Sequence, residues 1–167
     1  MLAPAVFFWQ IALAVHIIFV VAAFGLLLAY PFIVMAVERF DVRSLPVLLR
    51  VRQLLGRNLV NPGLLIVVIA GVYLAAHAHQ WHAFYVQWGI GAAIVMGALE
   101  GMFMIPREGR LADLARSDLE AQSGQSGTVV IRGAEYQAVF RQVAIGGMAL
   151  SLIVILTVYF MATQAGA

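Results

Sequence analysis

Four long apolar segments alternate with shorter polar stretches along the chain. They cover residues 5–37, 59–76, 83–105 and 136–163, and Glu100 is the one charged side chain well inside them. Each holds roughly 20 residues or more, enough to cross about 30 Å of hydrocarbon. Lipid offers the backbone no hydrogen bonds, so such segments cross it as helices. The pattern predicts an all-α, polytopic membrane protein, a four-transmembrane-helix bundle forming a single domain over residues 1–167.

The charges predict how this bundle is oriented. All ten arginines lie within residues 39–57 and 107–141, and there is no lysine. Connections rich in arginine stay on the cytoplasmic side of a bacterial inner membrane. The connection at residues 77–82 and both terminal stretches carry no charged side chain, so we expect both termini outside. Trp9, Trp81 and Trp88 fall near the outer ends, where tryptophan favours the interface.

The two cytoplasmic connections have helical periodicity of their own. In residues 44–57 and 109–121, apolar side chains recur every three or four positions. This spacing predicts short amphipathic helices on the cytoplasmic membrane surface. Asn61 followed by Pro62 is typical of the beginning of a helix, with Asn61 as its cap.

Composition narrows the classes of function. The chain is 63% hydrophobic and 11% charged, with a mean hydropathy of +0.96. A net charge of +2 is too small to indicate nucleic-acid binding, so the expected partners are the lipid bilayer and further membrane protein. The absence of cysteine excludes disulfides, thiolate metal sites and iron–sulfur clusters.

Small residues form a ridge on the third segment. Gly89, Ala93, Gly97 and Gly101 follow one another at intervals of four residues. Such a ridge lets a second helix approach closely. The second helix belongs either to the same chain or to another copy in a homo-oligomer.

Glu100 is expensive at membrane depth and needs either a partner or a proton. Arg141 and Asn61 enter neighbouring segments at the same level and are candidate partners. One interpretation is a structural polar clamp, and the other is an acid that carries a proton or binds an ion.

His16 lies within the apolar first segment, seven residues beyond Trp9. Helix rise places it about 10 Å below the outer interface. A neutral imidazole there either bonds a neighbouring helix or acts as an axial ligand to haem or another metal.

His77, His79 and His82 form a second group at the outer end of the second segment. They are either polar loop residues or ligands for copper, nickel or zinc. His16 and His77 together could also hold a haem between the first two segments.

Residues 10–24, with His16 among apolar and small side chains, resemble the first span of a bacterial superfamily. It includes the HemJ protoporphyrinogen oxidases and the CopD copper-resistance membrane proteins. Asn61-Pro62 with Gly71-Val-Tyr-Leu74 is similar to the second HemJ span, and residues 104–115 resemble an uncharacterised actinobacterial branch. The resemblance implies a compact, often oligomeric bundle holding haem b through His16. HemJ proteins carry a lysine early in the third span that this chain lacks, which disfavours porphyrinogen oxidation.

Three functions remain open. The first is a redox or haem/metal-handling protein that binds haem b or a metal, copper or zinc included, through His16. The second is a small oligomeric transporter or channel using Glu100 and His16. The third is a structural or accessory membrane subunit without catalysis.

Overall fold

The computed structural model describes residues 7–122 and 132–166, which form six α-helices. Short 3-10 and π-helical segments lie between some of them. In chain order the elements are α1 (Phe8–Phe40), η1 (Val42–Ser44), α2 (Leu45–Leu55), η2 (Gly56–Val60), α3 (Asn61–His77), α4 (Phe84–Ala98), η3 (Leu99–Met104), α5 (Ile105–Ala121) and α6 (Ala134–Thr163).

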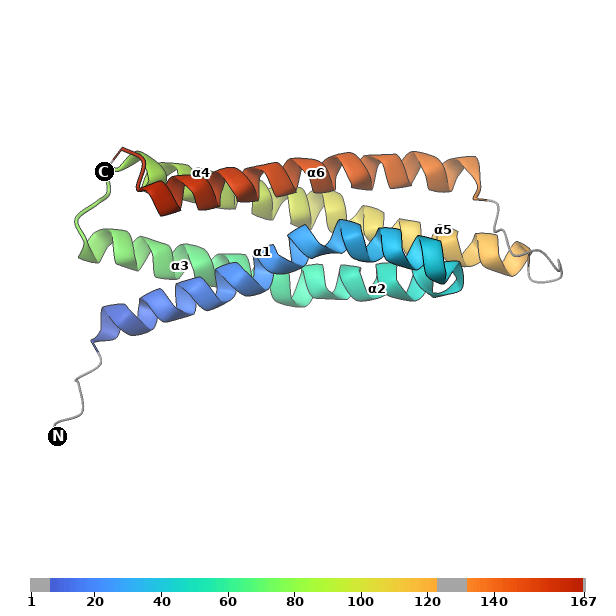
Figure 1. The fold of residues 1–167 in the computed structure, drawn as a ribbon, viewed down its shortest axis with the longest axis horizontal. Coiled ribbons are helices and arrows are strands. Elements are labelled where there is room, and N and C mark those ends of the chain that lie inside the picture. The colour runs from blue at the N-terminus through green and yellow to red at the C-terminus, as the bar shows by residue number, and fades with distance from the viewer. Residues whose placement is uncertain (1–6, 123–131, 167) are drawn as a thin grey trace, which may run out of the picture.

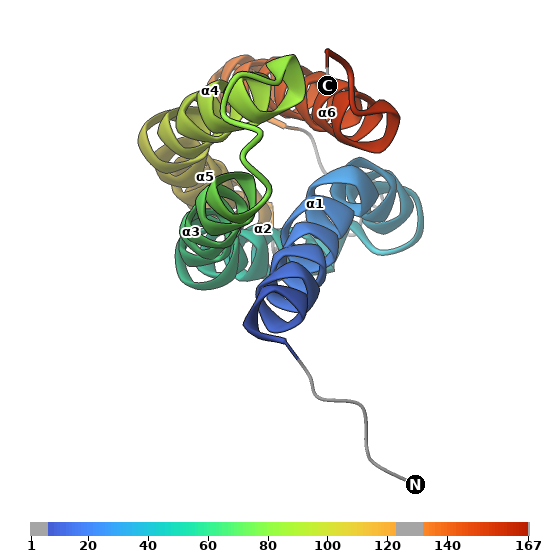
Figure 2. The same cartoon turned by 90° about the vertical axis from the view of Figure 1, so that its left-hand side faces the viewer.

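These elements combine into four rods that run along one long axis (Figure 1). The π-helical segment η2 joins α2 to α3 in one helix, Leu45–His77, and η3 joins α4 to α5 in another, Phe84–Ala121. Viewed along the axis, α1, α3, α4 and α6 form a ring in which each contacts the next (Figure 2). The all-α bundle expected from the sequence is confirmed.

The four rods are long and apolar enough to cross a membrane. Their outward faces carry large apolar side chains, including Ile18, Val21, Leu65, Ile94 and Met148, each more than 60% exposed. Contiguous apolar surface of this kind is typical of a protein that contacts lipid. The rods hold 30 to 38 residues, about 45–57 Å at 1.5 Å per residue, so they exceed a hydrocarbon layer of about 30 Å.

The two ends of the bundle differ in composition. The start of α1, the α3–α4 connection and the end of α6 lie together at what we term the tryptophan end, which holds Trp9 and Trp81 (Figure 1). The opposite end, here the arginine end, consists of α2, α5, the end of α1 and the start of α6. The chain therefore starts and finishes its helical part at the same end of the bundle (Figure 1).

The predicted surface helices are parts of the long rods. Residues 44–57 and 109–121 fall largely in α2 and α5, which continue α3 and α4 along the bundle axis (Figure 1). Leu45, Leu49, Leu111 and Ala115 are at most 1% exposed, because α2 and α5 pack on each other. Packing of one apolar face against another helix supplies most of the stability of such helices.

The prediction that Asn61 caps a new helix is wrong. Residue 60 has helical φ and ψ, and the helix runs through Asn61 and Pro62 without interruption. Proline lacks the N–H and its ring crowds the carbonyl one turn earlier. In both long rods a π-helical segment ends two residues before the proline, η2 before Pro62 and η3 before Pro106, and the wider turn accommodates the ring.

The ridge of small residues faces other helices of the same chain. A Cβ added at Gly89 would lie 2.3 Å from Met161 Cε of α6, and one at Gly97 would lie 3.4 Å from Leu64 Cδ2 of α3. One at Gly101 would lie 3.0 Å from Asn61 Nδ2, and Ala93 is 7% exposed. The ridge thus lets α4 and η3 approach both neighbours closely.

Candidate functional site

A cavity of about 950 Å³ lies between the rods at the tryptophan end. Its walls come from α1, α3, α4 and α6 and are mostly apolar, with Leu13, Val20, Phe24, Val67, Ile90 and Met161 among them. Sites for small molecules and cofactors typically measure 300–1,000 Å³ and combine apolar walls with a few polar groups. The cavity therefore has the size and lining of a binding site.

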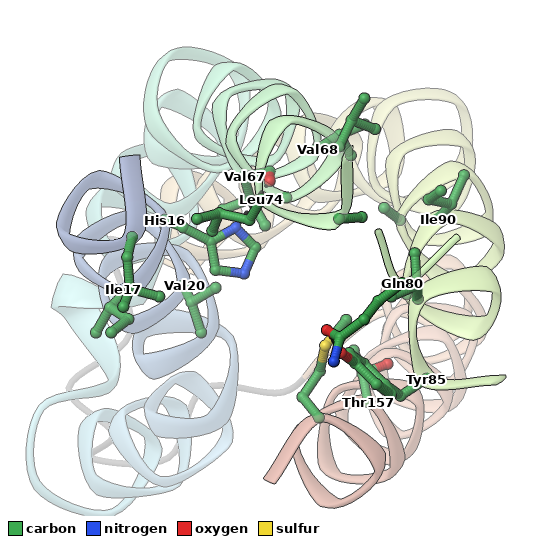
Figure 3. Close-up of a pocket in the computed structure, with 18 of the residues that line it drawn as sticks. His16, Ile17, Val20, Val67, Val68, Leu74, Gln80, Tyr85, Ile90 and Thr157 are labelled. Atoms are coloured by element: carbon green, nitrogen blue, oxygen red, sulfur yellow. Dashed lines mark hydrogen bonds between the residues drawn. The ribbon is translucent and has the colours of Figure 1, made fainter. Parts of the chain in front are cut away.

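His16 is the principal polar group on one wall of this cavity. Its Nδ1 lies 2.9 Å from the carbonyl oxygen of Val67 on α3. A carbonyl only accepts hydrogen bonds, so Nδ1 carries the proton, and Nε2 of the neutral ring keeps a free lone pair. Within the described residues Nε2 makes no hydrogen bond, and Figure 3 shows the ring pointing into the cavity.

Gly71 makes this orientation of His16 possible. A Cβ at position 71 would lie 3.1 Å from His16 Cε1 and 3.4 Å from Nδ1. With glycine at that position, the imidazole packs directly on the α3 backbone, one turn beyond the carbonyl that it bonds. The local sequence thus fixes both the position of the ring and its tautomer.

The opposite wall carries polar groups that already have partners. Gln80, Tyr85 and Thr157 lie across the cavity from His16 (Figure 3). The Tyr85 hydroxyl donates to Gln80 Oε1, and Thr157 Oγ1 accepts from Trp88 Nε1 at 3.1 Å and donates to the Ile153 carbonyl at 2.7 Å. His16 Nε2 thus faces the cavity as a free acceptor.

The structure does not place His77 opposite His16. The His77 ring stacks between Trp9, with ring centroids 6.2 Å apart, and Tyr73, at 6.1 Å. It lies six residues beyond Gly71 on α3, about 9 Å further along the axis than His16. Two nitrogens bound to one metal lie at most about 4 Å apart, since each is about 2 Å from it. A haem held by both histidines is therefore incompatible with this arrangement, although His77 does line the rim of the cavity.

The remaining histidines lie outside the cavity. His79 and His82 are exposed in the α3–α4 connection. Among the residues that the structure describes, no three His, Asp or Glu side chains are arranged to hold a metal ion. The candidate copper or zinc ligands His77, His79 and His82 are therefore not gathered into one site.

Glu100 has a partner that the sequence analysis missed. Its Oε1 accepts a hydrogen bond from Arg52 Nη1 of α2 at 2.7 Å, and Arg52 Nη2 lies 3.4 Å from Glu108 Oε1 of α5. All three side chains are at most 2% exposed. We refer to them as the Arg52 cluster.

The predicted partners of Glu100 have other roles. Arg141 is exposed on α6, and the Asn61 side chain lies against Gly101, so neither replaces Arg52 in the ion pair.

Gly56 makes room for this cluster. A Cβ at Gly56 would lie 2.8 Å from Glu100 Oε1 and 2.9 Å from Arg52 Nη1. The Arg52 guanidinium also lies over the Tyr30 ring, 5.1 Å from its centroid. A signal for this was present in the sequence: Leu45, Leu49, Arg52 and Gly56 recur at helical spacing, which places the arginine on a buried stripe.

No protein-family description, characterised protein or solved structure matches this chain significantly. The functional proposal therefore rests on the residues themselves.

Proposed function

We propose that this chain is a multi-pass membrane protein that binds an apolar cofactor through His16, with haem b as the specific candidate. The observation that carries the proposal is the geometry of His16. One ring nitrogen is fixed by the Val67 carbonyl, and the other faces an apolar cavity with a free lone pair.

The residues present fit a haem with a single histidine ligand. Imidazoles that bind metals commonly donate their other N–H to a backbone carbonyl, which fixes the ring and raises its basicity. The walls offer mostly apolar contacts to the ligand, and the lining residues Gln80, Gln164 and His77 offer hydrogen-bond donors for carboxylates. A bound haem would supply one-electron chemistry, tuned by its axial ligand and by burial.

The proposed setting is the bacterial inner membrane, with the arginine end at the cytoplasmic face. The exposed arginines at this end are Arg39, Arg43, Arg50, Arg110, Arg116 and Arg141, and Arg57 follows α2 on η2. Positive charge there favours the cytoplasmic side and its anionic lipids. The cavity then lies nearer the outer face, which suits a redox or haem-handling role on that side.

The proposed transporter would need Glu100 and His16 along one polar route. Glu100 is not among the residues that line the described cavity, and it is already paired with Arg52. Glu100 and His16 therefore belong to separate sites, which favours cofactor binding over transport.

The test is a haemin titration of the purified full chain in detergent, followed by absorption spectroscopy. We expect a shifted Soret band at a stoichiometry of one, which is lost in a His16→Ala variant. His82→Ala is the matched control, because it removes an exposed histidine that does not line the cavity. A wild-type chain with no Soret shift, or a band that persists in His16→Ala, would overturn the proposal.

A further inference from the structure

The Arg52 cluster contains more negative than positive groups. Arg52 supplies one cation, and Glu100 and Glu108 supply two carboxyl groups, all at most 2% exposed. If both carboxyl groups were ionised, the cluster would hold a net charge of −1 out of contact with water. Burying an uncompensated charge costs several kcal/mol, and buried groups commonly become neutral instead.

The hydrogen bonds show which carboxyl group lacks compensation. Glu100 Oε1 accepts from Arg52 at 2.7 Å, whereas neither oxygen of Glu108 has a hydrogen-bond partner among the described residues. Glu108 is 0% exposed, and its contact with Arg52, at 3.4 Å, is longer than a good hydrogen bond. Arg52 therefore compensates the negative charge of Glu100 more than that of Glu108.

The groups around Glu108 supply no second cation. The titratable groups that interact with it are Arg52 from α2, Glu100 from η3 and Tyr30 from α1. The Tyr30 hydroxyl is also buried without a hydrogen-bond partner within the described residues. Among these described groups, Arg52 is the only cation.

We propose that the Arg52 cluster is a proton-binding site in which Glu100 and Glu108 share one exchangeable proton, held at rest by Glu108. Uptake forms one O–H bond from a lone pair of a Glu108 carboxylate oxygen and breaks one O–H bond of a hydronium ion, which becomes water, so nothing is oxidised or reduced. The proton makes the cluster neutral and gives Glu108 a donor. The site is separate from the cavity, because its residues do not line the described cavity.

The number of protonated carboxylic acids in the cluster follows for the native chain and for each variant. The number of protonated carboxylic acids equals the number of buried acids minus the number of buried cations. It is one in the native chain, none in Glu108→Gln, none in Glu100→Gln and two in Arg52→Met. In Glu100→Gln, the remaining acid ionises because Arg52 is then free to pair with it.

Infrared spectroscopy at neutral pH measures this count through the carbonyl stretch of a protonated carboxylic acid. We expect the native chain to show one such band that shifts on ¹³C-glutamate labelling and on exchange into heavy water. The band should vanish in both glutamine variants, grow about twofold in Arg52→Met, and stay unchanged in Glu135→Gln, whose side chain is exposed.

A native chain without a label-sensitive band would overturn the proposal, and so would a band that persists in Glu108→Gln. If a variant does not fold, the labelled native chain alone decides. The measurement needs no cofactor, so its outcome is independent of the haemin titration.

Discussion

The two ends of the bundle bury polar groups in opposite ways. At the tryptophan end, His16 has one nitrogen bonded and one free, beside a cavity of about 950 Å³. At the arginine end, Arg52 and Glu100 form a close ion pair inside a core whose leucines, such as Leu45 and Leu111, are 0% exposed. The tryptophan end thus contains a cavity and a hydrogen-bond acceptor without a partner, whereas the arginine end is closely packed around an ion pair.

The two ends of the same helices therefore contribute differently, the tryptophan end to binding and the arginine end to stability. A cavity lacks the dispersion contacts that its lining atoms would otherwise make, so it lowers stability. The packed arginine end, where α2 contacts α5 and α5 contacts α6, can offset that loss because both ends share continuous rods. We therefore expect changes at the arginine end to affect folding, and changes at the tryptophan end to affect binding.

The largest effect is expected from Arg52→Met. The change leaves two buried carboxyl groups without a cation, and removing one partner of a buried ion pair typically costs about 3–5 kcal/mol. The free energy of unfolding in mixed micelles measures it. Arg50→Met is the matched control, since its pair with Asp113 is exposed and such pairs contribute about 0–1 kcal/mol. Equal losses in the two variants would remove the energetic distinction between the buried and the exposed pair.

An intermediate effect is expected from Gly56→Ala. The added methyl would lie 2.8 Å from Glu100 Oε1, so the ion pair must move apart, at a cost of about 1–3 kcal/mol. At Gly147 of α6 a Cβ meets nothing within 4 Å, and Gly147→Ala should be neutral or stabilising by up to about 1 kcal/mol. Thermal unfolding of both variants checks this contrast. If Gly56→Ala were as stable as the Gly147 control, the close packing of the cluster would be disproved.

The smallest effect on stability is expected from Gly71→Ala. Its Cβ would lie 3.1 Å from His16 Cε1, and the imidazole ring can move into the cavity to avoid it. The free energy of unfolding should therefore change by less than about 1 kcal/mol. The displaced ring loses its bond to Val67, and haemin affinity should fall about tenfold or more. Gly25→Ala is the control, because nothing lies within 4 Å of a Cβ there. Unchanged affinity in Gly71→Ala would show that the orientation of His16 does not govern binding.

Much of the fold could be predicted because lipid-facing helices need long apolar runs. The joining of α2 to α3 and of α4 to α5 into uninterrupted helices could not be predicted from the sequence. Asn61-Pro62 has the sequence of a helix start, yet η2 and the packing of α2 on α5 keep the chain helical through it. Tertiary contacts thus overrode the local preference for a helix start at Asn61.

The candidate sites were predictable in part. The depth of His16 and the need of Glu100 for a partner follow from single polar residues in apolar surroundings. Their actual partners do not follow. Val67 contributes a backbone carbonyl, which any residue carries, and Arg52 lies 48 positions before Glu100 in a segment with several arginines. Glu108 has charged neighbours in the sequence, which give no sign that its side chain is buried, yet it is 0% exposed.

The continuous helix Leu45–His77 has a mechanical consequence. Val67, which holds His16, and Arg52, which holds the two acids, are 15 residues apart on it, about 22 Å by helix rise. A tilt of about 5° pivoting at Val67 would displace Arg52 by roughly 2 Å, enough to break a hydrogen bond. Moving as a rigid rod, the helix would therefore turn a small tilt at the cavity into a larger displacement where the charges meet.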